Sequence, residues 1–118
     1  MLLDFSVKNH LSFAEEQRFS MFAAKAIKKP EEIHLLPVPN SNDKALACAL
    51  IYGANAAGKS NLLKAFAFIR NAVMLSFTSL PDSGTFVTNF ALDPALKAAP
   101  SEFSIDFIAA VSGRFRFL

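Results

Sequence analysis

The sequence reads Gly53-Ala54-Asn55-Ala56-Ala57-Gly58-Lys59-Ser60 near its centre, which fits the phosphate-binding loop (P-loop) pattern G-x-x-x-x-G-K-[ST]. Gly53 and Gly58 let the backbone approach a ligand closely, so that neighbouring amide groups can form an anion-binding nest. Lys59 supplies a flexible positive charge for the terminal phosphates, and the Ser60 hydroxyl is a natural ligand of Mg2+. The pattern therefore predicts that the chain binds a nucleoside triphosphate with Mg2+.

The segments on both sides of the loop provide the strand-loop-helix context that this pattern requires. Residues 45–52 form a continuous apolar run, which is typical of a strand buried on both faces of a parallel sheet. After the loop, apolar residues recur at steps of three and four, at Leu62, Phe66, Ile69, Val73 and Phe77. That spacing predicts an amphipathic helix over residues 59–76 whose amino end faces the phosphates. A chance glycine turn with an incidental Lys-Ser pair is the disfavoured alternative.

Length and composition predict one small domain with a packed core, because the chain has 118 residues, is 53% hydrophobic and contains thirteen Phe. We divide it into four segments. These are an N-terminal β-hairpin at 1–24, a loop-rich insert at 25–44, the strand, P-loop and helix at 45–77, and an irregular connection with a C-terminal hairpin at 78–118. The insert is rich in Pro and Asn and is expected to be exposed.

Alternation of apolar and polar residues predicts the strands outside the P-loop unit. Leu3, Phe5 and Val7 alternate with polar residues, and residues 18–21 repeat the alternation after a polar break. Residues 103–107 alternate in the same way and are followed by a Ser-Gly turn and a second alternating stretch, which together predict the C-terminal hairpin. Residues 85–92 are expected to form a short edge strand and residues 93–100 an irregular connection.

Charge and cysteine content exclude several classes of function. A net charge of +2 is too small to indicate nucleic-acid binding by itself. The one cysteine, Cys48, rules out a disulfide framework and is expected to be a buried thiol in a reducing compartment. His10 and His34 lack neighbours at metal-ligand spacing. The amino terminus lacks the features of a signal peptide and no apolar stretch is long enough to span a bilayer, so the expected location is the cytoplasm.

Several motifs together carry a family resemblance. They are Val7-Lys8-Asn9-His10-Leu11-Ser12-Phe13, the P-loop extended to Asn61-Leu62-Leu63-Lys64, Phe90-Ala91-Leu92-Asp93 and Pro100-Ser101-Glu102-Phe103. The chain resembles the amino-terminal part of the ABC-type ATPases of the SMC, RecF and OLD group. More narrowly, it resembles the bacterial AAA-family, OLD-like ATP-binding proteins that are linked to abortive infection and phage defence.

The resemblance implies an α/β fold, namely the N-terminal lobe of an ABC/OLD-like P-loop NTPase with an antiparallel strand subdomain, here incomplete. It implies ATP and Mg2+ as cofactors, and self-association or a partner ATPase subunit, because two heads of that group sandwich two nucleotides. Involvement of DNA or RNA rests on family analogy alone. Lys8, Asn9 and Ser12 match a family segment that lies near the nucleotide, whereas His10 and Leu11 depart from it. Ala56 stands where Gly is common in the family, and alanine at this position keeps its backbone amide as a hydrogen-bond donor.

The predicted nucleotide-binding residues are Gly53, Ala54, Asn55, Ala56, Ala57, Gly58, Lys59, Ser60 and Asn61, with Ser60 as the Mg2+ ligand. No catalytic residue is predicted, because Asp4 and Asp106, which follow apolar residues, are interpreted as solvated strand carboxylates. Three hypotheses stay open. The chain is an ATPase completed by missing Walker B and signature segments or by a partner, a nucleotide-binding module without turnover, or a truncated chain that serves only for association.

Overall fold

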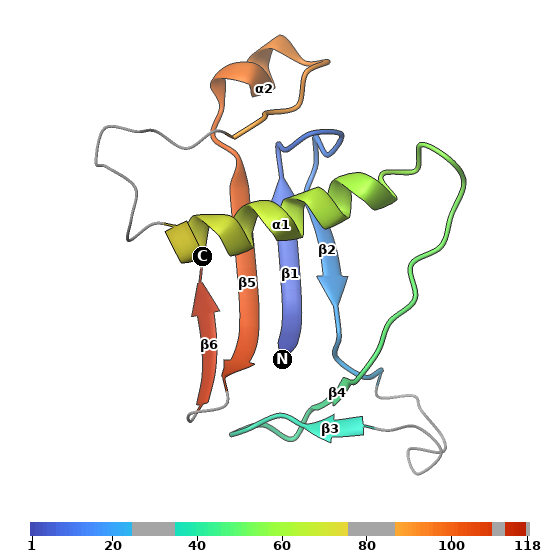
Figure 1. The fold of residues 1–118 in the computed structure, drawn as a ribbon, viewed down its shortest axis with the longest axis vertical. Coiled ribbons are helices and arrows are strands. Elements are labelled where there is room, and N and C mark those ends of the chain that lie inside the picture. Colours follow the sequence, from blue (N-terminus) through green and yellow to red (C-terminus); the bar gives the residue numbers. More distant parts are fainter. Residues whose placement is uncertain (25–34, 76–86, 110–112, 118) are drawn as a thin grey trace. The chain divides into compact units, whose positions relative to one another are not determined.

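The computed structural model describes residues 1–24, 35–75, 87–109 and 113–117. In chain order the elements are β1 (Leu2–Lys8), β2 (Gln17–Ser20), β3 (Leu35–Pro37), β4 (Lys44–Leu46), α1 (Lys59–Leu75), α2 (Pro94–Ala98), β5 (Glu102–Ala109) and β6 (Gly113–Phe117). A four-stranded sheet has the order β2-β1-β5-β6, and β3 and β4 form a separate pair (Figure 1). The chain divides into two compact units, the first made of Met1–Ser6, Arg18–Leu50 and Ser104–Leu118, the second of Val7–Gln17 and Ile51–Phe103.

The four-stranded sheet confirms the strands predicted from alternation. Leu3, Phe5 and Val7 of β1 are fully buried, while the residues between them are half-buried. Neighbouring strands run in opposite directions (Figure 1), and β5 pairs with β6 from Ile105 opposite Phe117 to Ala109 opposite Gly113. The period-two pattern therefore gave the strands correctly, because one face of β1 is covered.

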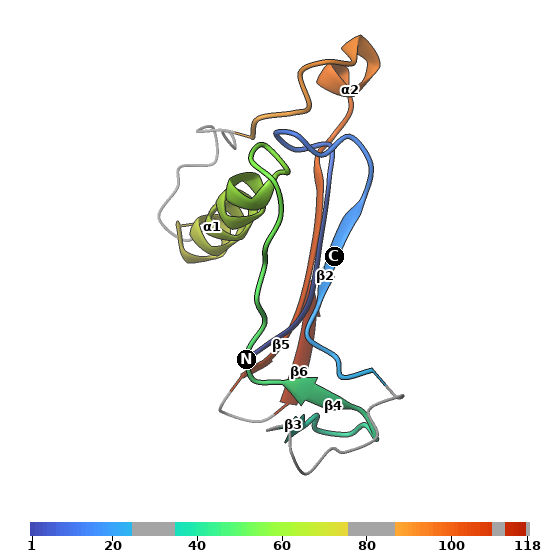
Figure 2. The same cartoon turned by 90° about the vertical axis from the view of Figure 1, so that its right-hand side faces the viewer.

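The core of the first unit includes a residue of the loop-rich insert. Leu3, Val38 and Ala45 form a buried cluster against which Phe22 and Ile108 pack. Figure 2 shows β3 and β4 as a short ribbon at the end of the larger sheet where β1 begins. The expectation that residues 25–44 are exposed is therefore wrong at Val38, and residues 25–34 lie outside the described part of the chain.

The predicted strand over residues 45–52 is the main correction. Strand β4 ends at Leu46 and pairs antiparallel with β3, and the following residues are extended without strand pairing. Leu50 and Tyr52 are 88% and 92% exposed, and Cys48 is exposed rather than buried. A strand buried in a parallel sheet needs partners on both edges. In the described residues no strand lies beside residues 47–52, and these residues are exposed.

The connection before β5 also differs from the expectation. Residues 94–98 form the short helix α2, whose first turn is capped by Asp93, since its Oδ1 accepts a hydrogen bond from the Ala95 amide at 2.9 Å. An Asp cap followed by Pro at the first helical position is a recognised helix start. Residues 87–92 are not a strand, and residues 85–86 lie outside the described ranges. The Phe90 amide donates to the Asn9 side chain instead of to a strand neighbour.

An aromatic cluster forms part of the second unit. The His10 ring lies 5.6 Å from the Phe68 ring and 5.1 Å from the Phe103 ring, and the two Phe rings stack at 4.9 Å. His10 is only 4% exposed, and its Nδ1 atom has no hydrogen-bond partner among the described residues. The cluster fixes α1 to the turn after β1 and to the start of β5 within this unit.

Burial lowers the pKa of His10 below its usual value of 6.5, and a hydrogen bond to the Thr88 backbone partly opposes this shift. The unfolded chain therefore binds more protons than the folded chain at mildly acidic pH. We expect the free energy of unfolding to fall as the pH drops below about 6.5, with no contribution from His10 above that value. Between about pH 7.5 and about pH 5.5, the free energy of unfolding in urea should fall more for the unmodified chain than for His10→Gln. Equal losses in both chains would contradict this assignment.

Candidate functional site

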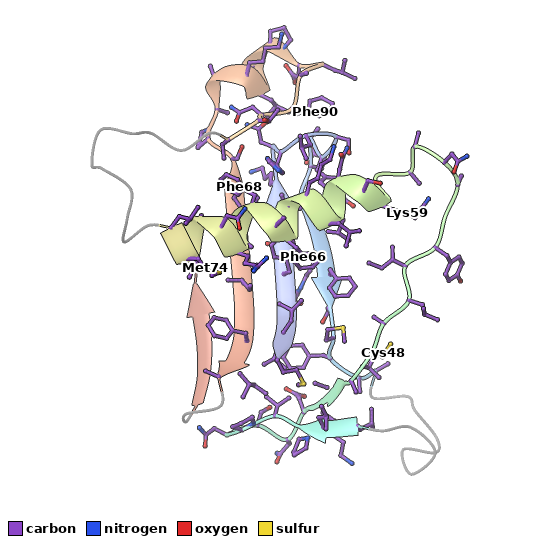
Figure 3. The ribbon with its side chains drawn as sticks, in the orientation of Figure 1. Cys48, Lys59, Phe66, Phe68, Met74 and Phe90 are labelled. Atoms are coloured by element: carbon purple, nitrogen blue, oxygen red, sulfur yellow. The ribbon has the colours of Figure 1, made fainter. Side chains whose placement is uncertain are left out.

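The loop of residues 53–60 leads directly into the amino end of α1. The first helical hydrogen bond runs from the Leu62 amide to the Gly58 carbonyl at 2.9 Å. The amides of Lys59, Ser60 and Asn61 therefore precede the first helical donor and point out of the helix start. Figure 3 shows Lys59 at this end of α1. A helix start of this kind attracts anions through its free amides and its dipole.

Two residues of the loop have left-handed backbone conformations. Gly58 has φ 87° and Ala56 has φ 65°. The left-handed backbone favours glycine at Gly58, and a Cβ atom there would also press on the Phe13 ring, since it would lie 3.1 Å from Cε1 of Phe13. At Gly53 a Cβ atom would meet only Ala57 at 3.6 Å, which is ordinary contact. In this structure the glycine requirement is therefore stronger at Gly58 than at Gly53.

The positive φ of Ala56 predicts a stabilising substitution. An L-residue in the left-handed region costs about 1–2 kcal/mol, whereas glycine adopts it freely. We expect Ala56→Gly to raise the free energy of unfolding by about 1 kcal/mol in urea titrations. The matched control is Ala57→Gly, because Ala57 is not among the residues with positive φ. Ala57→Gly should lower the free energy of unfolding by about 0.5–1 kcal/mol. A change of the same sign in both variants would contradict the prediction.

The side chain of Lys59 closes the loop on itself. Its Nζ atom donates hydrogen bonds to the carbonyl oxygens of Gly53 at 2.7 Å and Ala54 at 2.6 Å. The Ala57 amide donates to the Ala54 carbonyl at 3.3 Å and completes a turn. Because the ammonium group has three donors on a flexible stem, it can exchange these carbonyls for phosphate oxygens.

Ser60 is the exposed hydroxyl of the first helical turn. Among the described residues no three His, Cys, Asp or Glu side chains come together as a metal site. Mg2+ in nucleotide sites is usually held by one or two protein ligands together with phosphate oxygens and water. The exposed hydroxyl of Ser60 would supply one such protein ligand.

The turn after β1 contacts the P-loop, which the sequence did not predict from its own patterns. The Nδ2 atom of Asn61 donates to Oγ of Ser12 at 2.8 Å. Phe13 and Ser12 also line the space in which a Cβ atom of Gly58 would lie. The amide of Asn61 thus remains at the helix start, while its side chain binds Ser12. The resemblance of residues 7–13 to a family segment near the nucleotide was the signal for this contact.

Lys8 and Asn9, the other matched residues of that segment, bind protein groups instead. Asn9 is 1% exposed, and its Nδ2 atom lies within hydrogen-bond distance of three carbonyl oxygens, those of Leu96 (2.7 Å), Ala99 (2.9 Å) and Pro100 (3.2 Å). Its Oδ1 atom accepts from the Phe90 amide at 3.1 Å. Lys8 forms an ion pair with Glu102 at 2.9 Å, which raises the pKa of Lys8. Both side chains therefore hold residues 90–102 in place.

The two carboxylates interpreted as solvated are both engaged by protein. Asp4 forms an ion pair with Arg18 at 2.9 Å. Asp106 is only 2% exposed, and β5 is an inner strand between β1 and β6. The solvated interpretation is wrong for Asp106, because alternation identifies the two sides of a strand but does not say which sides are covered. Both residues belong to the first compact unit, and the P-loop belongs to the second.

Comparison with known proteins gives the family. One protein-family model, described as "AAA domain, putative AbiEii toxin, Type IV TA system", matches residues 48–118, which is more than half of the chain. The chain belongs to this AAA domain family. Membership gives the AAA domain a P-loop NTPase fold and indicates nucleotide binding. The mixed α/β structure with antiparallel sheets is consistent with part of such a fold.

The other comparisons add no relatives to this AAA domain. The search of curated proteins and the search of solved structures returned no match. Among the helices of the described residues, neither is long and apolar enough to cross a bilayer.

Proposed function

We propose that this AAA domain binds ATP with Mg2+ through residues 53–61. One observation carries the proposal. The amides of Lys59, Ser60 and Asn61 precede the first helical donor at the start of α1, and the ammonium group of Lys59 lies on the first two carbonyls of the same loop, which has two left-handed residues. Amides at a helix start with one flexible cation are suited to a polyphosphate.

Each loop residue has a role in this binding mode. In this mode the backbone amides of Gly53, Ala54, Asn55, Ala56, Ala57 and Gly58 would turn toward the phosphates, and the Ala57 amide would leave the Ala54 carbonyl to which it donates at 3.3 Å. Lys59 leaves the carbonyls of Gly53 and Ala54 and neutralises the terminal phosphates. The hydroxyl of Ser60 would hold Mg2+, which when bound spreads and neutralises phosphate charge.

Hydrolysis requires, in addition, a carboxylate near Mg2+ and a group that orients water. Asp4 is paired with Arg18 and Asp106 is buried, so neither is assigned this role. We propose that the domain is the N-terminal lobe of an ATPase head of the ABC, RecF and OLD type. In that case the hydrolytic groups come from further segments or from a partner ATPase subunit, and ATP drives dimerisation. By family analogy its setting is phage defence or a DNA-related process in the cytoplasm.

A second candidate function is an association module that does not turn ATP over. It is favoured by the exposed apolar side chains of Tyr52, Leu63 and Met74, which all belong to the second unit. Exposed apolar side chains mark an interaction site when they gather into a patch. Sedimentation with and without nucleotide separates the two functions, since only the ATPase head should dimerise in response to ATP.

Calorimetric titration of the folded chain tests the nucleotide assignment. ATP, ADP and AMP are compared in the presence and absence of Mg2+. We expect ATP with Mg2+ to bind most tightly and AMP most weakly, because the loop and Lys59 engage the outer phosphates. A folded chain that binds none of the three would rule the proposed function out and leave the association module.

A further inference from the structure

We infer that Ser12 is a positioning residue that holds the P-loop in its phosphate-binding conformation through Asn61. This deepens the proposed function and rests on it. Ser12 contacts the site from the turn after β1, and no motif of the P-loop includes it. The hydrogen bond from Nδ2 of Asn61 to Oγ of Ser12, at 2.8 Å, joins this turn to the first turn of α1.

The turn that carries Ser12 is held on two sides. The His10 amide donates to the Phe13 carbonyl at 3.0 Å, and the Phe13 amide donates to the His10 carbonyl at 2.9 Å. The Leu11 amide donates to the Thr88 carbonyl at 3.0 Å, and Leu11 has a left-handed φ of 52°. A turn closed by reciprocal hydrogen bonds and bonded to a second segment offers a fixed support.

The P-loop rests on this support at two points. Oγ of Ser12 binds Asn61, whose amide belongs to the helix start that would face the phosphates. Phe13 lies against the Cα of Gly58, where a Cβ atom would come within 3.1 Å of its ring. Small displacements of amides that bind phosphate weaken several hydrogen bonds at once, because each bond depends on distance and angle. Ser12 therefore acts on affinity without touching the nucleotide.

The test is a double-mutant cycle on ATP-Mg2+ affinity with Ser12→Ala, Asn61→Ala and the double variant. Loss of one net hydrogen bond corresponds to about a 3- to 10-fold change in an equilibrium constant. We expect each single variant to weaken ATP-Mg2+ binding by about 3- to 10-fold. The double variant should bind about as tightly as the single variant with the lower affinity, because both substitutions remove the same hydrogen bond. Ser12→Thr keeps the hydroxyl and should restore affinity. Ser41→Ala, which also removes a hydroxyl bonded within the chain, to Asp43, should bind like the unmodified chain.

Nucleotide selectivity separates positioning from a merely structural role. A variant that only lowers the folded fraction weakens ATP and AMP binding equally, whereas a displaced loop loses ATP affinity more than AMP affinity. If Ser12→Ala does not fold, Asn61→Ala breaks the same bond from the helix side. Unchanged ATP affinity in the folded single variants, or strictly additive losses, overturns the inference while the proposed function stands. Absence of ATP binding by the unmodified chain overturns both.

Discussion

Replacing Lys59 by Ala is expected to weaken ATP-Mg2+ binding by about 100-fold or more, which corresponds to about 3 kcal/mol. The ammonium group is the flexible cation of the loop, and hydrogen bonds between an ionised donor and phosphate are the strongest of the polar contacts available there. The measurement is calorimetric titration of the variant and the unmodified chain under identical salt, because phosphate contacts are screened by salt.

Folding should be almost unaffected in Lys59→Ala. In the free chain the ammonium group of the lysine donates to the carbonyl oxygens of Gly53 and Ala54, in an exposed setting where water can replace it. The matched control is Lys64→Ala, which removes the same charge from an exposed position on the same helix and should retain ATP binding. Undiminished affinity in Lys59→Ala at equal folded fraction would remove the P-loop from the binding site.

Asn9→Asp is expected to lower the free energy of unfolding by about 3 kcal/mol or more. The substitution keeps the shape of the side chain but removes the Nδ2 donor, which faces the carbonyl oxygens of Leu96, Ala99 and Pro100. It also places a carboxylate at a position that is 1% exposed. A buried charge that faces carbonyl oxygens is unfavourable, because both groups are hydrogen-bond acceptors.

Urea unfolding measures the loss, and amide hydrogen exchange locates it. We expect the amides of residues 90–101 to exchange faster in Asn9→Asp, since Asn9 holds this segment to the end of β1. Asn42→Asp makes the same chemical change at an exposed position and should alter stability by less than about 0.5 kcal/mol. A similarly small change in Asn9→Asp would show that the amide contacts contribute little.

Elements with a clear hydrophobic period could be predicted from the sequence. The helix over α1 and the strand β1 are of this kind, because apolar residues recur at steps of three and four in the helix and at every second position in the strand. The run at residues 45–52 is equally apolar, yet only its first two residues lie in β4. An apolar sequence indicates that a segment is stable when it is buried. It does not show whether a neighbouring strand is present to bury it.

The residues of the candidate site also differ in whether the sequence could predict them. The nine residues from Gly53 to Asn61 follow from a contiguous pattern with a local mechanism. The contact between Ser12 and Asn61 joins residues 49 positions apart, and that between Asn9 and Leu96 joins residues 87 positions apart. Such side-chain hydrogen bonds leave no periodic trace in the sequence. By contrast, the cap of α2 carries a local signal that the prediction of an irregular connection overlooked, since Asp93 directly precedes Pro94.

The exposed thiol of Cys48 has a practical consequence for every assay described above. It is the chain's one cysteine, so a thiol-reactive fluorophore will attach at a single position, a few residues before the P-loop. The same accessibility lets two chains form a covalent disulfide in air. Sedimentation data on nucleotide-driven pairing therefore need a reductant, and a label at Cys48 reports on the segment before the P-loop without further mutagenesis.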